Sequence, residues 1–190
     1  MTTGRRPLVD RRLSVEEAAE VVRRRSLTSR LRGRLEDHPP AALEGIAYWP
    51  IAIVEATARS TGRRRWTERV RGAVDLVSGR IGLVDEEVRV LDSVYVEQGT
   101  VVPARLGRQT ALDAWHEYFR DYIDRLRKPM SPPTLSVDSV ERLWLEHLIL
   151  TECDREFLVD PVTHRADPLE SFPWVIQARE AARTHQAVEH

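Results

Sequence analysis

One seven-residue segment occurs in two versions in this chain. V-D-L-V-S-G-R runs from Val74 to Arg80, and V-D-P-V-T-H-R runs from Val159 to Arg165. Each follows an apolar run that contains a tryptophan, Trp49 in the first case and Trp144 in the second. Aligned on these segments, both halves of the chain read as helix, strand, strand and turn. The sequence therefore predicts an α+β fold with an internal pseudo-duplication, in which helices pack on an antiparallel sheet.

The polar residues of the two segments indicate turns. Aspartate, serine and threonine side chains can bond backbone N–H groups within a tight turn. We therefore expect Asp75 and Ser78 in the first segment, and Asp160 and Thr163 in the second, to form turns.

The patterns around these segments place the other elements. Ser14 and Glu17 have the spacing of a capping box, which predicts the start of a helix. Residues 66–75 alternate with a period of two, which predicts a strand with Trp66, Val70 and Val74 facing the core and Arg69 and Arg71 on the other face.

A second helix is expected from its apolar face, capped by Thr110 with Asp113 and stopped by Pro129. The expected segments are a flexible arm over 1–12, a first αβ half over 13–105, a second αβ half over 106–180 and a frayed tail over 181–190.

A helix followed by a strand pair that ends in V-D-L-V-S-G-R-I, at residues 74–81, resembles the small αβ unit of PepSY-type domains. The resemblance covers roughly residues 13–84. The second copy departs from it, because His164 stands where the glycine belongs and Pro161 follows the aspartate. The resemblance implies a curved antiparallel sheet with a helix packed across it, and a binding, inhibitory or chaperoning module without an active site.

Composition limits the possible functions. No stretch approaches the apolar length of a membrane span, and the first residues lack the apolar core of a signal peptide, so we expect a cytoplasmic protein without membrane contact. The single cysteine, Cys153, excludes an internal disulfide and a multi-cysteine zinc site. His116 is followed four residues later by Arg120 instead of a second histidine.

Motifs for catalysis are likewise missing from the sequence. It contains neither a phosphate-binding glycine loop nor a nucleophile elbow. His147, Cys153 and His164 could converge with Asp160 on a cation, but strand and turn positions favour structural roles. We therefore predict no metal, no cofactor and, on balance, no enzymatic activity.

Charge and aromatic residues give the candidate binding surfaces. Residues 1–80 carry 17 basic and 10 acidic residues, net +7, and residues 81–190 carry 12 and 20, net −8. This split favours contact with another protein chain, including a second copy, whereas an isoelectric point near 6.6 argues against nucleic acid. If one sheet face were uncovered, Trp49, Trp66 and Trp144 would line it. The candidate binding residues are Arg63, Arg64, Arg65, Arg69, Arg71, Trp49, Trp144 and His147.

Two functions follow from these observations. The first is a noncatalytic binding or assembly module that acts through protein–protein contacts. The alternative is a small-molecule-binding protein or enzyme with a pocket on a curved sheet, in which His147 or His116 and nearby carboxylates would act as acid and base.

Overall fold

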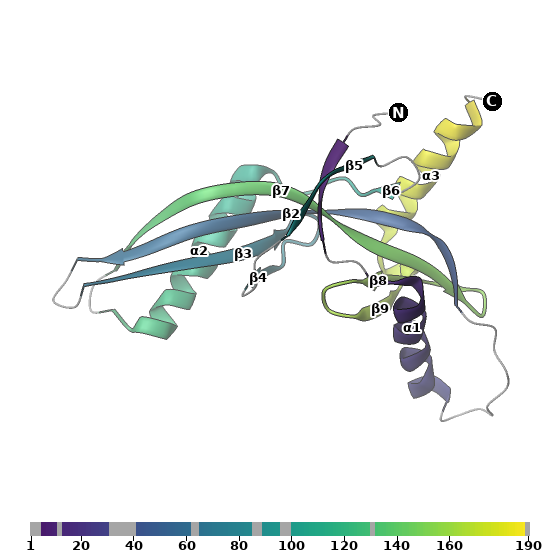
Figure 1. Ribbon diagram of the computed structural model, residues 1–190, viewed down its shortest axis with the longest axis horizontal. Helices are drawn as coiled ribbons and strands as arrows, with labels where there is room; N and C mark the ends of the chain where they lie inside the picture. Colours follow the sequence, from purple (N-terminus) through teal and green to yellow (C-terminus); the bar gives the residue numbers. More distant parts are fainter. Residues whose placement is uncertain are drawn as a thin grey trace. The chain divides into compact units, whose positions relative to one another are not determined.

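The computed structural model describes residues 5–10, 13–30, 41–61, 65–84, 89–95, 100–129 and 132–188. Within these ranges the chain forms an α+β structure with mostly antiparallel strand pairs, which confirms the predicted fold class (Figure 1). The helices are α1 (Val15–Arg30), α2 (Arg108–Arg127) and α3 (Pro173–Val188), with a short 3-10 turn η1 (Leu169–Ser171). The strands are β1 (Arg5–Val9), β2 (Ala42–Ser60), β3 (Trp66–Asp75), β4 (Ile81–Leu83), β5 (Val90–Tyr95), β6 (Thr100–Val101), β7 (Thr134–Glu152), β8 (Arg155–Asp160) and β9 (Arg165–Pro168).

The chain divides into two compact units, each assembled from separate stretches of sequence. Unit 1 comprises Met1–Trp49, Arg89–Pro103 and Trp144–His190, and unit 2 comprises Pro50–Val88 and Ala104–Leu143. The predicted halves therefore do not coincide with the compact units. The physical reason is that the long strands β2 and β7 each contribute residues to both units.

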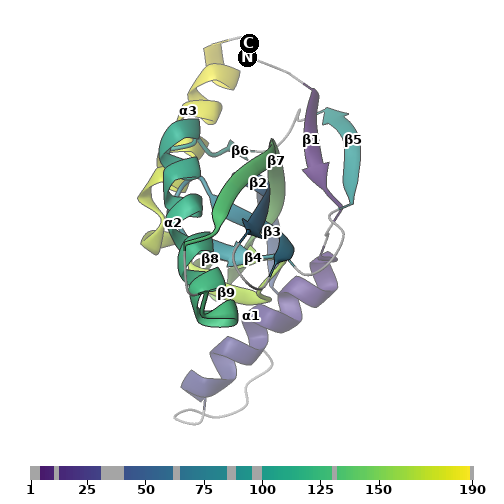
Figure 2. The ribbon, with the colours of Figure 1, turned by 90° about the vertical axis from the view of Figure 1, so that its left-hand side faces the viewer.

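Unit 2 is a sheet of neighbouring strands β4, β3, β2 and β7 with α2 along one face (Figure 2). The predicted facing of β3 is confirmed, since Trp66, Val70 and Val74 all pack into the cluster under α2. Small residues on β2 let the large α2 side chains approach the sheet closely. The buried residues of this cluster are Ala52, Val54, Ala56, Ala58, Val74, Leu76, Ala111, Trp115, Phe119 and Ile123.

The ends of α2 differ in how well the sequence predicted them. The predicted cap at Thr110 is wrong, because the helix begins two residues earlier and its N-cap is Gly107, which has no side-chain capping bond. Asp113 instead accepts a hydrogen bond from Gln109 at 2.8 Å. At the other end, Lys128 takes the left-handed conformation that commonly ends helices, and Pro129 follows as predicted.

In unit 1, α1 packs on β8 and β9 and on the end of β7 (Figure 1). The predicted capping box is confirmed: the backbone N–H of Ser14 donates to Glu17 at 2.9 Å, and the backbone N–H of Glu17 donates to the Ser14 hydroxyl at 3.2 Å. The core of this region consists of Ala18, Val22, Leu148, Leu150, Phe157, Val159 and Ala166.

The predicted N-terminal segment needs correction. Arg5–Val9, expected in a flexible arm, forms strand β1, which pairs antiparallel with β5 and buries Leu8 completely. Its partner strand is distant in sequence, so local composition could not reveal it. The expected frayed tail from residue 181 is helical as far as Val188, at the end of α3.

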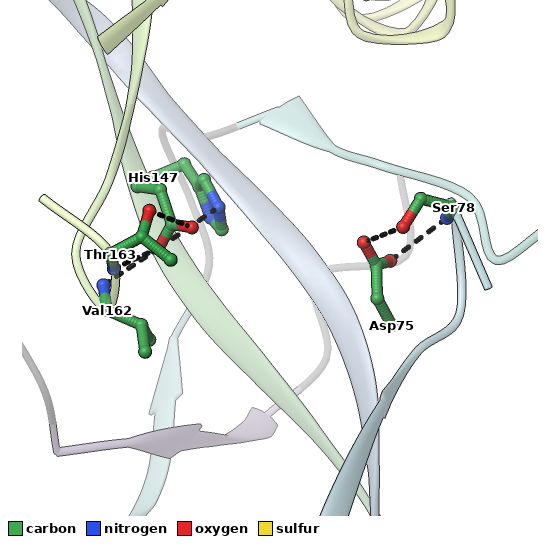
Figure 3. A network of polar contacts seen from close by, with 6 residues as sticks. Asp75, Ser78, His147, Val162 and Thr163 are labelled. Carbon is green, nitrogen blue, oxygen red and sulfur yellow. Dashed lines mark hydrogen bonds and ion pairs between the residues drawn. The ribbon is translucent and has the colours of Figure 1, made fainter. Parts of the chain in front are cut away.

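The two repeated segments form turns with the same hydrogen bonds (Figure 3). Asp75 Oδ1 accepts from the backbone N–H groups of residues 77 and 78, and its Oδ2 accepts from the Ser78 hydroxyl. Asp160 Oδ1 accepts from the N–H groups of residues 162 and 163, and its Oδ2 accepts from the Thr163 hydroxyl at 2.8 Å. The predicted turn roles of these residues are confirmed.

Candidate binding pocket

Two of the arginine candidates, Arg69 and Arg71, lie on β3, on the face of the sheet that points away from α2. Arg69 is exposed, and Arg71 Nε donates to Glu55 Oε1 at 2.8 Å. Ser139 Oγ also donates to this carboxylate, at 3.1 Å. The hydrogen bonds from Arg71 first, and from Ser139 second, lower the pKa of Glu55 below its ordinary value. Arg71 is therefore part of a neutral pair, and the predicted basic surface is smaller than expected.

The rest of the predicted arginine surface is only partly described. Arg65 precedes β3 and is exposed. Arg63 and Arg64 lie outside the described residues.

On the same face, β7 departs from regular alternation. Asp138 and Ser139 are consecutive, yet both bond side chains on one face of β2: Asp138 accepts from Thr57 at 2.5 Å, and Ser139 donates to Glu55. On the opposite face, Leu135 and Val140 both pack into the α2 cluster although their spacing is odd. Such an interruption is typical of a β-bulge.

The aromatic candidates do not gather on one sheet face. In unit 1, the rings of Trp49 and His147 lie 5.1 Å apart, and Phe172 meets Trp49 edge-on at 6.0 Å. Trp144 belongs to a different cluster, in which Arg6 lies over its indole ring at 4.9 Å. Trp66 packs under α2 in unit 2. Trp49, Trp144 and Trp66 therefore lie in three different groups of side chains.

His147 is buried, and its Nε2 lies 4.0 Å from Asp160 Oδ1, the same oxygen that accepts the turn hydrogen bonds (Figure 3). Cys153 is exposed in the two-residue turn between β7 and β8, where it and Asp154 have positive φ. In the described ranges, no three histidine, cysteine or acidic side chains form a group able to hold a metal.

One pocket of the described residues lies within unit 2, at the N-terminal end of α2. Its volume is about 470 Å³, within the range of small-molecule sites. Aliphatic side chains from the sheet, the loop before α2 and the first turns of α2 form most of its wall. Two arginines, Arg108 of α2 and Arg142 of β7, complete it. The lining residues are Ala52, Val54, Leu76, Ala104, Leu106, Gly107, Arg108, Ala111, Leu112, Val140 and Arg142.

The two aspartate turns allow strand positions of the two units to be compared by their register. Ala52 on β2 pairs with Val74, the residue directly before the first turn aspartate. Leu148 on β7 pairs with Val159, the residue directly before the second. Ala52 therefore corresponds to Leu148.

By the same register, Val54 corresponds to Leu150. In unit 1, Leu148 and Leu150 fill the space against α1. In unit 2, the smaller Ala52 and Val54 pack into the cluster under α2 and also form part of the pocket wall.

The charged side chains that line the pocket are both arginines. Arg108 and Arg142 are both exposed residues, and both line the pocket. The first turn of α2 contains no acidic residue, although acidic residues are favoured there by the helix dipole. The arrangement can bury an apolar group and hold an anion beside it.

Sequence reasoning did not identify Arg108 and Arg142. The available signals were the run of small residues at alternate positions of β2 and an arginine, in place of an acidic residue, at the start of α2. Neither signal indicates a pocket until the fold brings β7 beside β2.

No protein-family model, curated protein or solved structure matches this chain. The PepSY-type resemblance thus stays a prediction. Among the helices of the described ranges, none has the length and apolar character needed to cross a membrane.

Proposed function

We propose that this protein is a noncatalytic binding protein that holds a small, largely apolar ligand in the pocket of unit 2. The observation that carries the proposal is a pocket of about 470 Å³ whose wall is formed mostly by aliphatic side chains. Such a wall favours an apolar occupant, because binding removes apolar surface from water.

The chemistry of the lining supports binding without turnover. Its side chains are aliphatic except for two arginines, and arginine does not release its proton in proteins, so it cannot serve as a general base. Of the two small-molecule functions considered from the sequence, a binding protein is therefore favoured over an enzyme that uses a histidine as acid or base. Neither His147 nor His116 lines the pocket.

The internal duplication is part of the same proposal. The order helix, long strand, strand, aspartate turn, short strand occurs as α1-β2-β3-β4 and again as α2-β7-β8-β9. The shared turn hydrogen bonds support a common origin. Each helix packs on strands of the other copy: α2 lies on β2 and β3, whereas α1 lies on β8 and β9. In this proposal the two copies diverged, and the pocket arose where α2 packs on the strands of the first copy.

The test is binding of a neutral apolar fluorophore, N-phenylnaphthylamine, to the full chain. The double variant Ala52→Leu/Val54→Leu adds side-chain volume at the pocket wall, and we expect it to lose at least about tenfold in affinity. Because both positions are buried, we also expect its free energy of unfolding in urea to fall by about 1–3 kcal/mol. The control Ile53→Leu changes the opposite face of β2 at nearly constant volume and should bind like the wild type.

A second pocket variant guards against a misfolded double variant. Ala104→Leu fills the pocket from the loop before α2, away from the sheet. Wild-type protein that binds no fluorophore, or folded filling variants that bind it undiminished, would contradict the proposal.

A second candidate is binding to another protein chain, including a second copy, through the exposed arginines of the β3 region. Arg65 and Arg69 are exposed and make no ion pair with a carboxylate of the described residues. Self-association would give a mass that rises with concentration in sedimentation equilibrium and falls in Arg65→Glu/Arg69→Glu. A monomer at all concentrations would exclude the second copy as partner.

A further inference from the structure

We infer that the ligand of this pocket is an amphipathic anion: an aliphatic chain that carries one carboxylate or phosphate group at its end. The inference rests on the proposed function and specifies the chemistry of the occupant.

The interior of the pocket fits an aliphatic chain. Branched and small aliphatic side chains form its wall, and no aromatic ring is among the lining residues of the described chain. Such walls gain free energy from any apolar surface removed from water, without requiring a flat partner. A volume of about 470 Å³ accommodates a single chain of moderate length.

The two arginines define the other end of the ligand. Arg108 and Arg142 come from different elements, α2 and β7, and both line the same pocket. Guanidinium groups present paired N–H donors that match carboxylate and phosphate oxygens. Two positive charges at one pocket would repel an amine and leave a neutral head group without a charged partner.

The start of α2 adds to this preference. Its N-cap, Gly107, lines the pocket and provides no side-chain cap for the first N–H groups of the helix. These groups favour a negative charge at the helix N-terminus. The helix end strengthens a site that the cavity and the two arginines already form.

The probes are dodecanoate, dodecyl phosphate, dodecanol and dodecylamine, each tested below its aggregation concentration by displacement of N-phenylnaphthylamine and by calorimetry. We expect the two anions to bind at least about tenfold more tightly than dodecanol, and dodecylamine to bind most weakly. The tighter of the two anions identifies the head group, and equal affinities support recognition of negative charge in general.

Charge-removing variants test the role of each arginine. Arg108→Gln and Arg142→Gln should each lower dodecanoate affinity about tenfold and leave dodecanol affinity unchanged. Lysine at either position should restore part of the loss, because it keeps the charge without the paired donors. Arg120→Gln, an exposed arginine further along α2, is the matched control and should have no effect.

The outcomes separate this inference from the proposed function. If dodecanol binds as tightly as dodecanoate and the arginine variants do not change either affinity, recognition of an anionic head group is excluded. The proposal of an apolar binding pocket then remains. Undiminished dodecanoate binding in folded Ala52→Leu/Val54→Leu would place the anion elsewhere and overturn the inference. If neither the fluorophore nor any chain binds the wild type, both proposals are overturned.

Discussion

The indole ring of Trp115 on α2 lies directly against the backbone of Gly72 on β3. A Cβ atom added to Gly72 would overlap Cη2 and Cζ3 of the indole and would lie 2.8 Å from the carbonyl oxygen of Gly82. Trp115 is fully buried and stacks on Phe119, with ring planes 6° apart. The glycine thus sets how closely α2 approaches the sheet of unit 2.

We expect Gly72→Ala to lower the free energy of unfolding by about 1–3 kcal/mol, because the largest side chain of the core must move. Urea unfolding followed by tryptophan fluorescence measures the change. Gly82→Ala, in the adjacent strand β4, is the control, because nothing lies within 4 Å of its added Cβ. A similar loss in both variants would show that close packing against Trp115 is not the cause.

The two aspartate turns should contribute equally to stability. Asp75→Ala and Asp160→Ala each remove the acceptor of three hydrogen bonds, so each should cost about 1–3 kcal/mol in urea unfolding. Asp124→Ala, at an exposed position of α2, should change stability by no more than about 0.5 kcal/mol. A large effect at only one of the two turns would mean that they are not equivalent.

Gly79 and His164 occupy the same position in the two aspartate turns, so they offer a matched pair of substitutions. Gly79 has φ of 78° and His164 has φ of 50°, and both backbone N–H groups bond the carbonyl of their turn aspartate. A side chain is strained in this conformation and glycine is not. His164→Gly should therefore raise stability by about 0.5–1 kcal/mol, and Gly79→His should lower it by at least as much. Opposite signs in thermal unfolding are the expected result, and a loss in both variants would contradict it.

Glu55 should make stability depend on pH at the acidic end. Its pKa is lowered from the ordinary value of 4.5 by hydrogen bonds from Arg71 and Ser139. A carboxyl whose pKa is lowered by folding stabilises the protein above its unfolded pKa, and this contribution is lost as pH falls through the folded pKa. The effect is small, because the Glu55 side chain is 39% exposed and solvent screens the pair.

The stability difference between wild type and Glu55→Gln should therefore be largest near neutral pH and shrink below pH 4.5. Unfolding in urea across a pH series measures it, with Glu141→Gln, an exposed position on β7, as control. A difference that stays constant down to the lowest pH would exclude this role for Glu55.

Several features of the fold were predictable because they depend on neighbours in sequence. The alternation of residues 66–75 identified the core face of β3, since strand geometry alone decides where Trp66 and Val74 point. The Ser14–Glu17 capping box and the side-chain bonds of the Asp75 turn join residues no more than three positions apart. Such interactions require no knowledge of the rest of the chain.

Pairing between distant residues was decided by the tertiary structure alone. The strand Arg5–Val9 looks like a polar arm, and only its pairing with β5 and the burial of Leu8 make it a strand. No local pattern indicates that α2 packs on β2 and β3 instead of on β8 and β9. That choice depends on the fit between large α2 side chains and the small residues of β2.

The repeated segment therefore determined two turns and the order of elements, because both follow from local hydrogen bonds and periodicity. The sequence alone could not predict the pocket. Arg108 and Arg142 lie far apart along the chain, and they line one pocket only because α2 and this part of β7 belong to the same compact unit. Which side chains share a pocket is a property of packing, and packing is fixed only when the chain has folded.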